Sequence, residues 1–234
     1  AAAYERSYAH QYDRAWVVSS SEARAMKSIG GARHVDIVPN GVDAEHFHPG
    51  DEPTIPHSCA FWGRLDAGPN IAAASWFVRH VWPALRREFP DARFGLFGFA
   101  PVPAVLRLQG DGIAVTADAP DLRPLVRRHE VAVMPFVSGG GIKNKLLEAA
   151  AMAMPIVATP QGCVGLDARD GLPLVIARRP EDWVAAIARL WRNAIQRAEL
   201  GAKARAWVGQ RHTWEAAARC VSTRLRVRAP EVPA

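Results

Sequence analysis

The most informative stretch of this sequence runs from residue 131 to residue 148: Val131-Ala132-Val133-Met134-Pro135-Phe136-Val137-Ser138-Gly139-Gly140-Gly141-Ile142-Lys143-Asn144-Lys145-Leu146-Leu147-Glu148. It joins a short apolar run, typical of a buried parallel strand, to a glycine loop and the start of a helix. Glycines at such a point leave backbone N–H groups free at the positive end of the helix, where a pyrophosphate can bind. The stretch therefore predicts a phosphate site at the edge of a parallel sheet.

Similar apolar runs recur on both sides of this stretch and alternate with amphipathic segments. Six runs are expected to be strands: Cys59 to Trp62, Phe94 to Phe97, Ile113 to Val115, Val131 to Met134, Ile156 to Thr159 and Leu174 to Ile176. The alternation predicts an α/β fold with a doubly wound, parallel, Rossmann-like sheet. One helix is expected from Ile71 to Phe89, capped by Asn70 and stopped by Pro90. Three more are expected after the last strand, at Pro180 to Trp191, Gln196 to Val208 and Thr213 to Val227.

The first 48 residues do not follow this alternation. They predict a helix, a strand, a second helix and a second strand, at Tyr4 to Arg14, Trp16 to Ser19, Ser21 to Ile29 (capped by Ser21) and Val35 to Val38. Too few strands are present for an independent core. We therefore expect residues 1–48 to be the last unit of a preceding domain, and residues 49–234 to form the main domain with its C-terminal helices. Because the sequence starts at Ala1 without a methionine, we expect it to be a processed product or an excised part of a longer polypeptide.

Composition excludes several classes of protein. The three cysteines are far apart and form no C-x-x-C pair, which argues against a disulfide framework and a zinc site and favours a reduced cytoplasm. No apolar run approaches the ~20 residues of a spanning helix, and no signal peptide is evident. The net charge of +6 is compatible with nucleic acid, an anionic membrane face or a polyphosphate ligand. No aromatic and basic residues are interleaved as in nucleic-acid-binding proteins, so that partner is not expected.

Two of the four lysines in the chain, Lys143 and Lys145, fall at the start of the helix that follows the glycine loop. A lysine ammonium binds phosphate as a point charge. Glu148 lies on the same helix face, either in a salt bridge with Lys145 or as an acceptor for ribose hydroxyls. The spacing is not that of a Walker motif, so ATP hydrolysis is not indicated.

Other strand ends carry weaker signals. Gly63 and Arg64 follow the first strand, where a glycine permits close approach of a ligand and an arginine suits phosphate; a tight turn with a surface arginine is the alternative. Gly98 and Asp118 follow the second and third strands, and ordinary loop chemistry explains them equally well. Cys163 has no nearby activating group and is expected to be a packing residue.

Several motifs together resemble glycosyltransferase family 4. They are Val38-Pro39-Asn40-Gly41-Val42-Asp43 with Phe47 and Pro49, Phe61-Trp62-Gly63-Arg64-Leu65 with Pro69-Asn70, Lys145-Leu146-Leu147-Glu148-Ala149, and Pro155-Ile156-Val157-Ala158-Thr159. The run Gly141-Ile142-Lys143-Asn144-Lys145 is similar to that of a bacterial subgroup associated with exopolysaccharide assembly. The resemblance covers roughly residues 15–215.

The resemblance implies a GT-B enzyme, with two Rossmann-like domains facing a cleft and this chain supplying the C-terminal one. Such an enzyme transfers a sugar with retention from a nucleotide diphosphate sugar to a glycan or lipid-linked acceptor, needs no metal or other cofactor, and belongs to EC 2.4. The implied location is the cytoplasm, with peripheral contact at the inner face of the membrane. By position, the implied catalytic residues are Arg64, Lys145 and Glu148. The implied donor-binding residues are Gly63, Gly98, Asp118, Gly139, Gly140, Gly141, Ile142, Lys143 and Asn144.

The sequence departs from the family pattern in two places. Gly140 stands where many members have a second glutamate, and Ala67-Gly68 stands where a lysine is common, so that Lys143 or Lys145 must take over that lysine's role. The acceptor pocket and a sugar-contacting histidine are expected outside this chain, so the chain alone is expected to be inactive. Two alternatives stay open: a GT-B epimerase acting on a nucleotide sugar, and a non-catalytic nucleotide-sugar-binding or scaffolding module.

Overall fold

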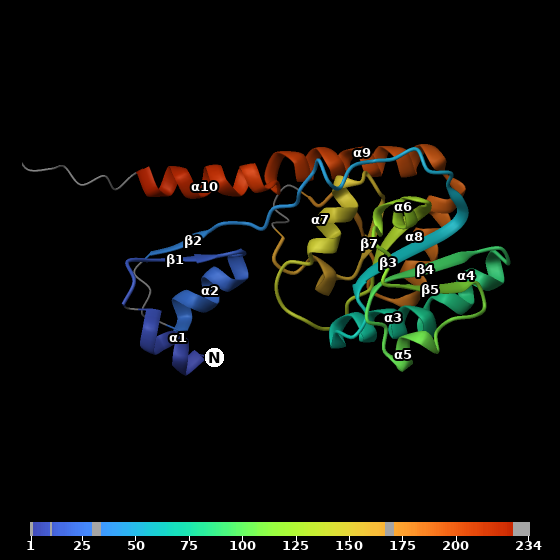
Figure 1. Ribbon diagram of the computed structural model, residues 1–234, viewed down its shortest axis with the longest axis horizontal. Helices are drawn as coiled ribbons and strands as arrows, with labels where there is room; N and C mark the ends of the chain where they lie inside the picture. The colour runs from blue at the N-terminus through green and yellow to red at the C-terminus, as the bar shows by residue number, and fades with distance from the viewer. Residues whose placement is uncertain (1, 10, 30–33, 167–170, 227–234) are drawn as a thin grey trace, which may run out of the picture.

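The structure is a computed structural model that describes residues 2–9, 11–29, 34–166 and 171–226. It consists of a large sheet domain and a small N-terminal unit, with two C-terminal helices lying along both (Figure 1).

The large domain is built on a six-stranded parallel sheet, and each of the six predicted strands is confirmed. The strands are β3 (Ile55–Arg64), β4 (Arg93–Phe99), β5 (Ile113–Ala117), β6 (His129–Met134), β7 (Ile156–Ala158) and β8 (Val175–Ile176). Their order is β5-β4-β3-β6-β7-β8. The chain thus winds outward from β3 to one edge and then from β6 to the other, which is the doubly wound Rossmann arrangement. The crevice beyond the carboxyl ends of β3 and β6 is where such sheets bind ligands.

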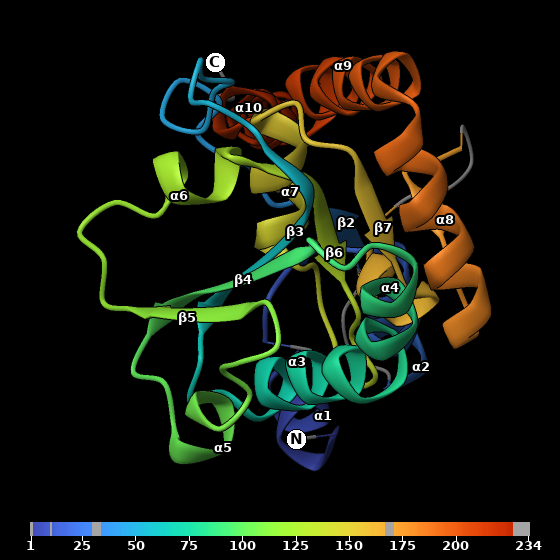
Figure 2. The ribbon, with the colours of Figure 1, turned by 90° about the vertical axis from the view of Figure 1, so that its right-hand side faces the viewer.

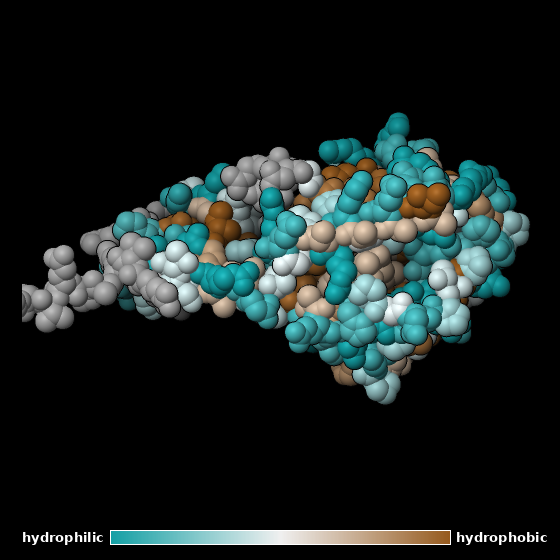
Figure 3. Space-filling view, turned by 90° about the horizontal axis from the view of Figure 1, so that it is seen from above, coloured by the Kyte–Doolittle hydropathy of each residue, from teal (hydrophilic) through white to brown (hydrophobic). Residues whose placement is uncertain are grey.

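Helices cover both faces of the sheet (Figure 2). One face carries α3 (Gly68–His80), α4 (Trp82–Glu88) and α8 (Pro180–Arg192), and the buried rings of Phe77 and Trp183 pack edge to face between them. The other face carries α6 (Arg123–Arg127) and α7 (Asn144–Ala151), with α9 (Ala194–Arg211) packed on α7. Two short helices, α5 (Pro103–Leu106) and the 3-10 turn η1 (Pro160–Cys163), follow β4 and β7. The face drawn in Figure 3 is mostly hydrophilic, with hydrophobic residues in separate small patches.

The helical segment between β3 and β4 differs from the prediction in two ways. It is divided into α3 and α4 at Val81, and Pro83 stands in the first turn of α4. Proline has no N–H to donate and is tolerated there, whereas it would break a continuous helix. The predicted cap at Asn70 is also wrong, because α3 begins at Gly68 and the Asn70 side chain points away to bond the Arg64 carbonyl and Lys145.

The N-terminal unit contains α1 (Ala2–Ala9), β1 (Arg14–Val17), α2 (Ser20–Ile29) and β2 (His34–Ile37). β1 and β2 pair in parallel and form a sheet of their own. The cap of α2 is Ser19 rather than the predicted Ser21: the Ser19 hydroxyl accepts from the backbone N–H of Glu22 at 3.2 Å. The Glu22 carboxylate accepts from the N–H of Val18, the residue before the cap, at 3.0 Å and so also fixes the helix start.

The last helix, α10 (Trp214–Arg226), packs on this unit rather than on the six-stranded sheet (Figure 1). Arg224 forms an ion pair with Asp36 of β2 at 3.2 Å, and the Cys220 thiol donates to the Ile37 carbonyl at 3.5 Å. The chain crosses between the two parts beside the start of this helix, where Val42 forms a β-bridge with Thr213. No helix within the described residues is long and apolar enough to cross a membrane.

Candidate functional site

Two adjoining hollows open at the carboxyl ends of β3 and β6. The first, of about 480 Å³, is here called the outer hollow, and its lining includes His46, Phe47, Phe99, Asp121 and Arg123. The second, of about 380 Å³, is called the glycine hollow, and its lining includes Asn70, Gly139, Gly140, Lys143 and Lys145. Both are lined by Trp62, Gly63 and Glu148. A larger hollow of about 790 Å³ lies between α4 and α8 and contains none of the predicted site residues, so we place the site at the strand ends.

The glycine loop folds back on its own lysine. The Lys143 ammonium donates to the carbonyl oxygens of Gly139, Gly140 and Gly141 at 3.0, 2.7 and 3.1 Å. The Gln161 side chain also donates to the Gly139 carbonyl, at 2.7 Å. Partial burial lowers the pKa of Lys143. These carbonyls hold the cation at the mouth of the glycine hollow, immediately before the first turn of α7.

Lys145 lies one residue inside the helix and is partly buried. Its ammonium donates to the Asn70 amide oxygen at 2.8 Å and lies over the rings of Phe61 and Phe136, at 4.2 and 5.1 Å from their centroids. Burial lowers the pKa of Lys145 to about 7, an effect that the nearby Glu148 partly opposes. An anion bound beside this lysine would stabilise its protonated form, because the anion replaces the favourable interaction with water that burial removes.

Glu148 occupies the boundary between the two hollows. Its carboxylate accepts from the Trp62 indole N–H at 2.7 Å. Burial raises the pKa of Glu148, while the Trp62 hydrogen bond and the charges of Lys145 and His46 lower it. Although all these residues are described, no ion pair within 4 Å joins Glu148 to Lys145; the salt bridge left open by the sequence is not formed.

The last two residues of β3, Gly63 and Arg64, lie beside the start of α7. Gly63 has φ of +132°, and a Cβ there would lie 2.7 Å from the Lys145 ammonium. Arg64 lies at the mouth of the outer hollow with its side chain 69% exposed, held by Asp66 through Nε at 3.0 Å and a terminal nitrogen at 2.5 Å. Lys145, rather than Lys143, therefore stands beside the Gly63–Arg64 turn, where the sequence lacks the family's usual lysine.

Gly98 and Asp118 lie at the same sheet edge but line neither hollow. A Cβ on Gly98 would come within 1.7 Å of the Gly63 carbonyl oxygen, so close packing of β3 on β4 explains this glycine. The Asp118 carboxylate accepts from the Ala100 N–H at 3.1 Å and ties the loops after β4 and β5 together.

The remaining predicted residues surround the helix start. Ile142 lines the glycine hollow, and its side chain touches Gly165 in the loop after β7. Gly141 has φ of +72°, which allows the loop to turn around Lys143. The Asn144 amide oxygen accepts from the Asn40 side chain at 3.0 Å and so links α7 to the segment that leaves β2. Cys163 is buried, and burial raises its pKa to about 11, as suits a packing residue.

The structure adds site residues for which the sequence indicated no site role: Trp62, His46, Phe47 and Arg123. It also brings Asp121, in the loop after β5, to the outer hollow. A signal existed for Trp62, since a tryptophan at the end of a buried strand needs a partner for its indole N–H. None existed for His46 and Arg123, which are 77 residues apart and meet only through the fold.

This fold and this edge site define the class of the protein: a Rossmann-like α/β domain with a cation- and carboxylate-lined crevice. Residues 56–193 match the family model described as Glycosyl transferases group 1, and the chain belongs to that family.

Known structures agree with this fold. HepE of Anabaena in complex with UDP and glucose matches with a TM-score of 0.76 at 13% identity, over 97% of this chain and 67% of HepE. TarM matches with a TM-score of 0.76 at 13% identity, over 96% of this chain and 45% of TarM. Sucrose-phosphate synthase of Thermosynechococcus elongatus matches with a TM-score of 0.75 at 18% identity, over 97% of this chain and 61% of the synthase. At these identities the likeness establishes the fold, which is that of a GT-B domain.

A curated relative is an uncharacterized 44.6 kDa protein in the cps region of Klebsiella pneumoniae. It is 27% identical over 132 residues, which are 52% of this chain and 34% of the Klebsiella protein. The match thus spans about a third of that relative's length.

Proposed function

We propose that this chain is the donor-binding half of a retaining glycosyltransferase of family 4, which moves a sugar from a nucleotide diphosphate sugar to a glycan or lipid-linked acceptor (EC 2.4). The observation that carries this proposal is the position of α7. It brings Lys145 to the wall of the glycine hollow, and Glu148 to the wall that this hollow shares with the outer hollow. Burial lowers the pKa of the lysine and raises that of the carboxylate.

Each residue has a separate part in the proposed chemistry. Lys145, with Arg64 and Lys143 at the mouth, neutralises the charge that develops on the leaving nucleoside diphosphate as the glycosidic bond breaks. Glu148 accepts hydrogen bonds from ribose hydroxyls, and Trp62 fixes its orientation. The glycine loop approaches the sugar and phosphates through its backbone. In this proposal the cations do the work that a metal does elsewhere, so no cofactor takes part.

The relatives favour the same assignment. HepE has been seen with UDP and glucose, and TarM of S. aureus with UDP. The Klebsiella relative is encoded in a cps region, which favours a role in bacterial polysaccharide biosynthesis. The cytoplasm, with peripheral contact at the inner face of the membrane, is the location that we propose.

Calorimetric titration with UDP-, GDP-, ADP- and CMP-sugars, in the presence of a chelator, tests the proposal. One of these donors should bind with a micromolar Kd, and EDTA should leave that Kd unchanged. Binding that appears only with added magnesium would overturn the metal-independent mechanism, and absence of binding by all four would overturn the proposed function.

We further propose that residues 1–48 belong to the acceptor side and residues 49–234 to the donor side, so that this 234-residue chain binds donor without transferring sugar. The separate sheet of β1 and β2 supports the division. Hydrogen exchange should be faster at residues 11–29 than at Ile156–Ala158, which are buried in the large sheet. Sugar transfer by the purified chain to any lipid or glycan acceptor would contradict this division of labour.

One observation favours a second candidate, a non-catalytic nucleotide-sugar-binding module. Gly140 stands where many family members have a glutamate, and a Cβ there would meet nothing within 4 Å. The glycine hollow is therefore open where that carboxylate would contact the sugar. Gly140→Glu should tighten UDP-glucose more than UDP if the sugar lies there. Donor hydrolysis by the wild-type protein would exclude a purely binding role.

A further inference from the structure

The segment that connects β2 to β3 supplies one wall of the outer hollow. His46 and Phe47 both line it, and their rings meet edge to face with centroids 4.9 Å apart. The Asp43 carboxylate accepts from the N–H groups of Glu45 and His46, at 3.0 and 2.8 Å, and closes a turn at this point. This turn belongs to no strand or helix. Phe47 packs against the core, whereas Asp43, Glu45 and His46 are exposed, so polar contacts with other elements help to fix the position of the turn.

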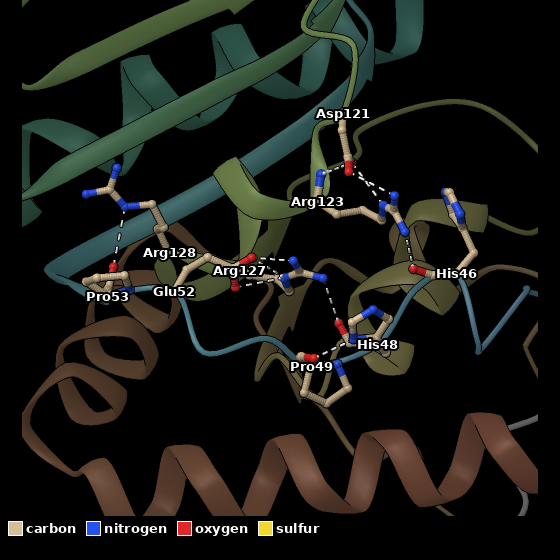
Figure 4. A network of polar contacts seen from close by, with 9 residues as sticks. All are labelled: His46, His48, Pro49, Glu52, Pro53, Asp121, Arg123, Arg127 and Arg128. Carbon is tan, nitrogen blue, oxygen red and sulfur yellow. Dashed lines mark hydrogen bonds and ion pairs between the residues drawn. The ribbon is translucent and has the colours of Figure 1, made fainter.

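Two arginines of α6, one helical turn apart, hold the segment (Figure 4). Arg123 donates to the His46 carbonyl at 2.6 Å. Arg127 donates to the His48 carbonyl at 3.1 Å and makes a two-pronged ion pair with Glu52. The connecting segment is thus held by side chains of the sheet domain at three successive points.

Among the hydrogen bonds of the described residues, those of Arg123 join the two opposite walls of the outer hollow. Besides His46, Arg123 binds the Asp121 carboxylate, through Nε at 2.9 Å and a terminal nitrogen at 2.8 Å, and Asp121 belongs to the loop after β5. Arg123, Asp121 and His46 all line the outer hollow, whereas Glu52 and His48 do not. The Arg123 side chain is 24% exposed, so its guanidinium is largely committed to these contacts.

We propose that Arg123 is a positioning residue that sets the outer hollow to the width of a nucleoside, by fixing the His46–Phe47 turn at a set distance from the loop after β5. This proposal rests on the proposed function. In it, the connecting segment contributes to recognition of the nucleoside part of the donor. The diphosphate, by contrast, meets Lys145 and the glycine hollow, which Arg123 does not touch.

Arginine and lysine carry the same charge but differ in the geometry of their N–H donors, so replacing Arg123 by lysine tests the positioning role without removing the positive charge. Arg123→Lys keeps the cation but loses the planar fork that pairs with both Asp121 oxygens while a further nitrogen reaches the His46 carbonyl. We expect the affinity for a nucleoside diphosphate to fall about five- to tenfold, the scale of a lost charge-assisted hydrogen bond. The affinity for inorganic pyrophosphate should stay within about twofold, since the lost contact lies in the outer hollow only.

Arg128→Lys is the matched control. Arg128 directly follows Arg127 and is exposed. Its side chain donates to the Pro53 carbonyl of the connecting segment at 3.4 Å, outside both hollows. Its affinities for nucleoside diphosphate and pyrophosphate should both equal those of the wild type. Thermal melting of each variant identifies any general loss of stability.

The measurement is calorimetric titration of the 234-residue chain with pyrophosphate and with UDP, GDP or ADP, whichever binds the wild type most tightly. Hydrogen exchange at residues 44–48 provides a second readout, in which the nucleotide should slow exchange in the wild type and not in Arg123→Lys. Unchanged nucleotide affinity in Arg123→Lys, or equal losses for nucleotide and pyrophosphate, would overturn the positioning role while the proposed function stands. Failure of the wild type to bind any of the three nucleotides would instead remove the proposed function.

Discussion

The glycine loop at residues 138–143 and the helix face formed by Lys145 and Glu148 are adjacent in sequence, yet they obtain their polar partners in different ways. Lys143 is bound by carbonyls of its own loop, two to four residues away. Lys145 and Glu148 are bound by Asn70 and Trp62, which lie 75 and 86 residues away in α3 and β3.

The Lys143 contacts are therefore local, whereas the Lys145 and Glu148 contacts form only when distant parts of the chain have folded together. A ligand that recruits Lys143 must compete with three carbonyls for a partly exposed ammonium. A ligand that reaches Lys145 finds an ammonium group that is already oriented. Because this group is poorly solvated, its positive charge is unfavourable until an anion binds beside it. We therefore expect binding energy to be concentrated on the helix face rather than on the loop.

We expect the largest change in UDP affinity when the two lysines are replaced one at a time. Lys145→Met should weaken UDP binding about a hundredfold, because it removes a buried charge-assisted contact. Lys143→Met should weaken it only about fivefold, because the ammonium it removes is partly hydrated and already shared with carbonyls. Calorimetric titration of both variants measures the ratio.

Thermal melting supplies the control for this pair. Without ligand, Lys145→Met should melt at or above the wild-type temperature, since it removes a desolvated cation from an apolar surrounding. Equal affinity losses in the two variants would show that the loop and the helix face contribute alike.

A smaller effect is expected at Glu148. Glu148→Gln keeps the shape and the Trp62 contact but removes the charge, so UDP affinity should fall about tenfold with little change in melting temperature. In the full-length enzyme most sugar transfer should be lost as well. Wild-type turnover in an assay of that enzyme would leave Glu148 with a structural role only.

The pH dependence of binding should report Lys145 directly. With a pKa of about 7, the ammonium is half deprotonated near neutrality, and a bound diphosphate raises that pKa. UDP affinity should therefore drop about fivefold between pH 7 and pH 8, with proton uptake on binding at pH 8. Titrations in two buffers of different ionisation enthalpy measure this uptake, which should vanish in Lys145→Met.

The stability of the ligand-free chain should change with pH in the opposite sense. The unfolded lysine holds its proton up to its ordinary pKa of 10.5, whereas the folded one releases it near 7, so between these values the unfolded state binds more protons. The Lys145 contribution to the free energy of unfolding thus rises from pH 7 to pH 10. Urea melts of the wild type against Lys145→Met isolate that contribution, and identical pH profiles would contradict it.

The smallest effect is expected at the partner supplied by β3. Trp62→Phe keeps an aromatic ring but removes the indole N–H that holds the Glu148 carboxylate. UDP affinity should fall about threefold through loss of orientation, and pyrophosphate affinity should not change. Equal weakening of both ligands would indicate general repacking rather than positioning of Glu148.

The two regions also show how far the sequence could predict the molecule. Apolar runs such as Val131 to Met134 located all six strands, because a buried parallel strand is a local pattern. The helix start at Lys143 and Lys145 was found for the same reason. The division at Val81 was missed because apolar periodicity continues across it, and the choice between Ser19 and Ser21 depended on one side-chain contact.

Long-range features could not be predicted in this way. Burial of Lys145 between Phe61 and Phe136, and with it the lowered pKa, exists only after β3 and α7 have packed together. The bridge from Arg123 to His46 depends on the path of the connecting segment, which has no periodic pattern. Asn70 was noticed as a helix cap and as part of a family motif, but its contact with Lys145 required the turn after β3 to bring them together.

The contacts at the junction beside α10 affect the order in which parts of the protein reach their native contacts during synthesis. The Asn40 carbonyl and the His212 ring, which meet there at 3.2 Å, are separated by 172 residues of chain. At a synthesis rate of about 5–20 residues per second, the segment around Asn40 waits about 9–34 s for its partner. During that interval β1 and β2 have emerged while Arg224, which binds Asp36, does not yet exist. The N-terminal unit is therefore synthesised well before the last helix, which completes its native contacts.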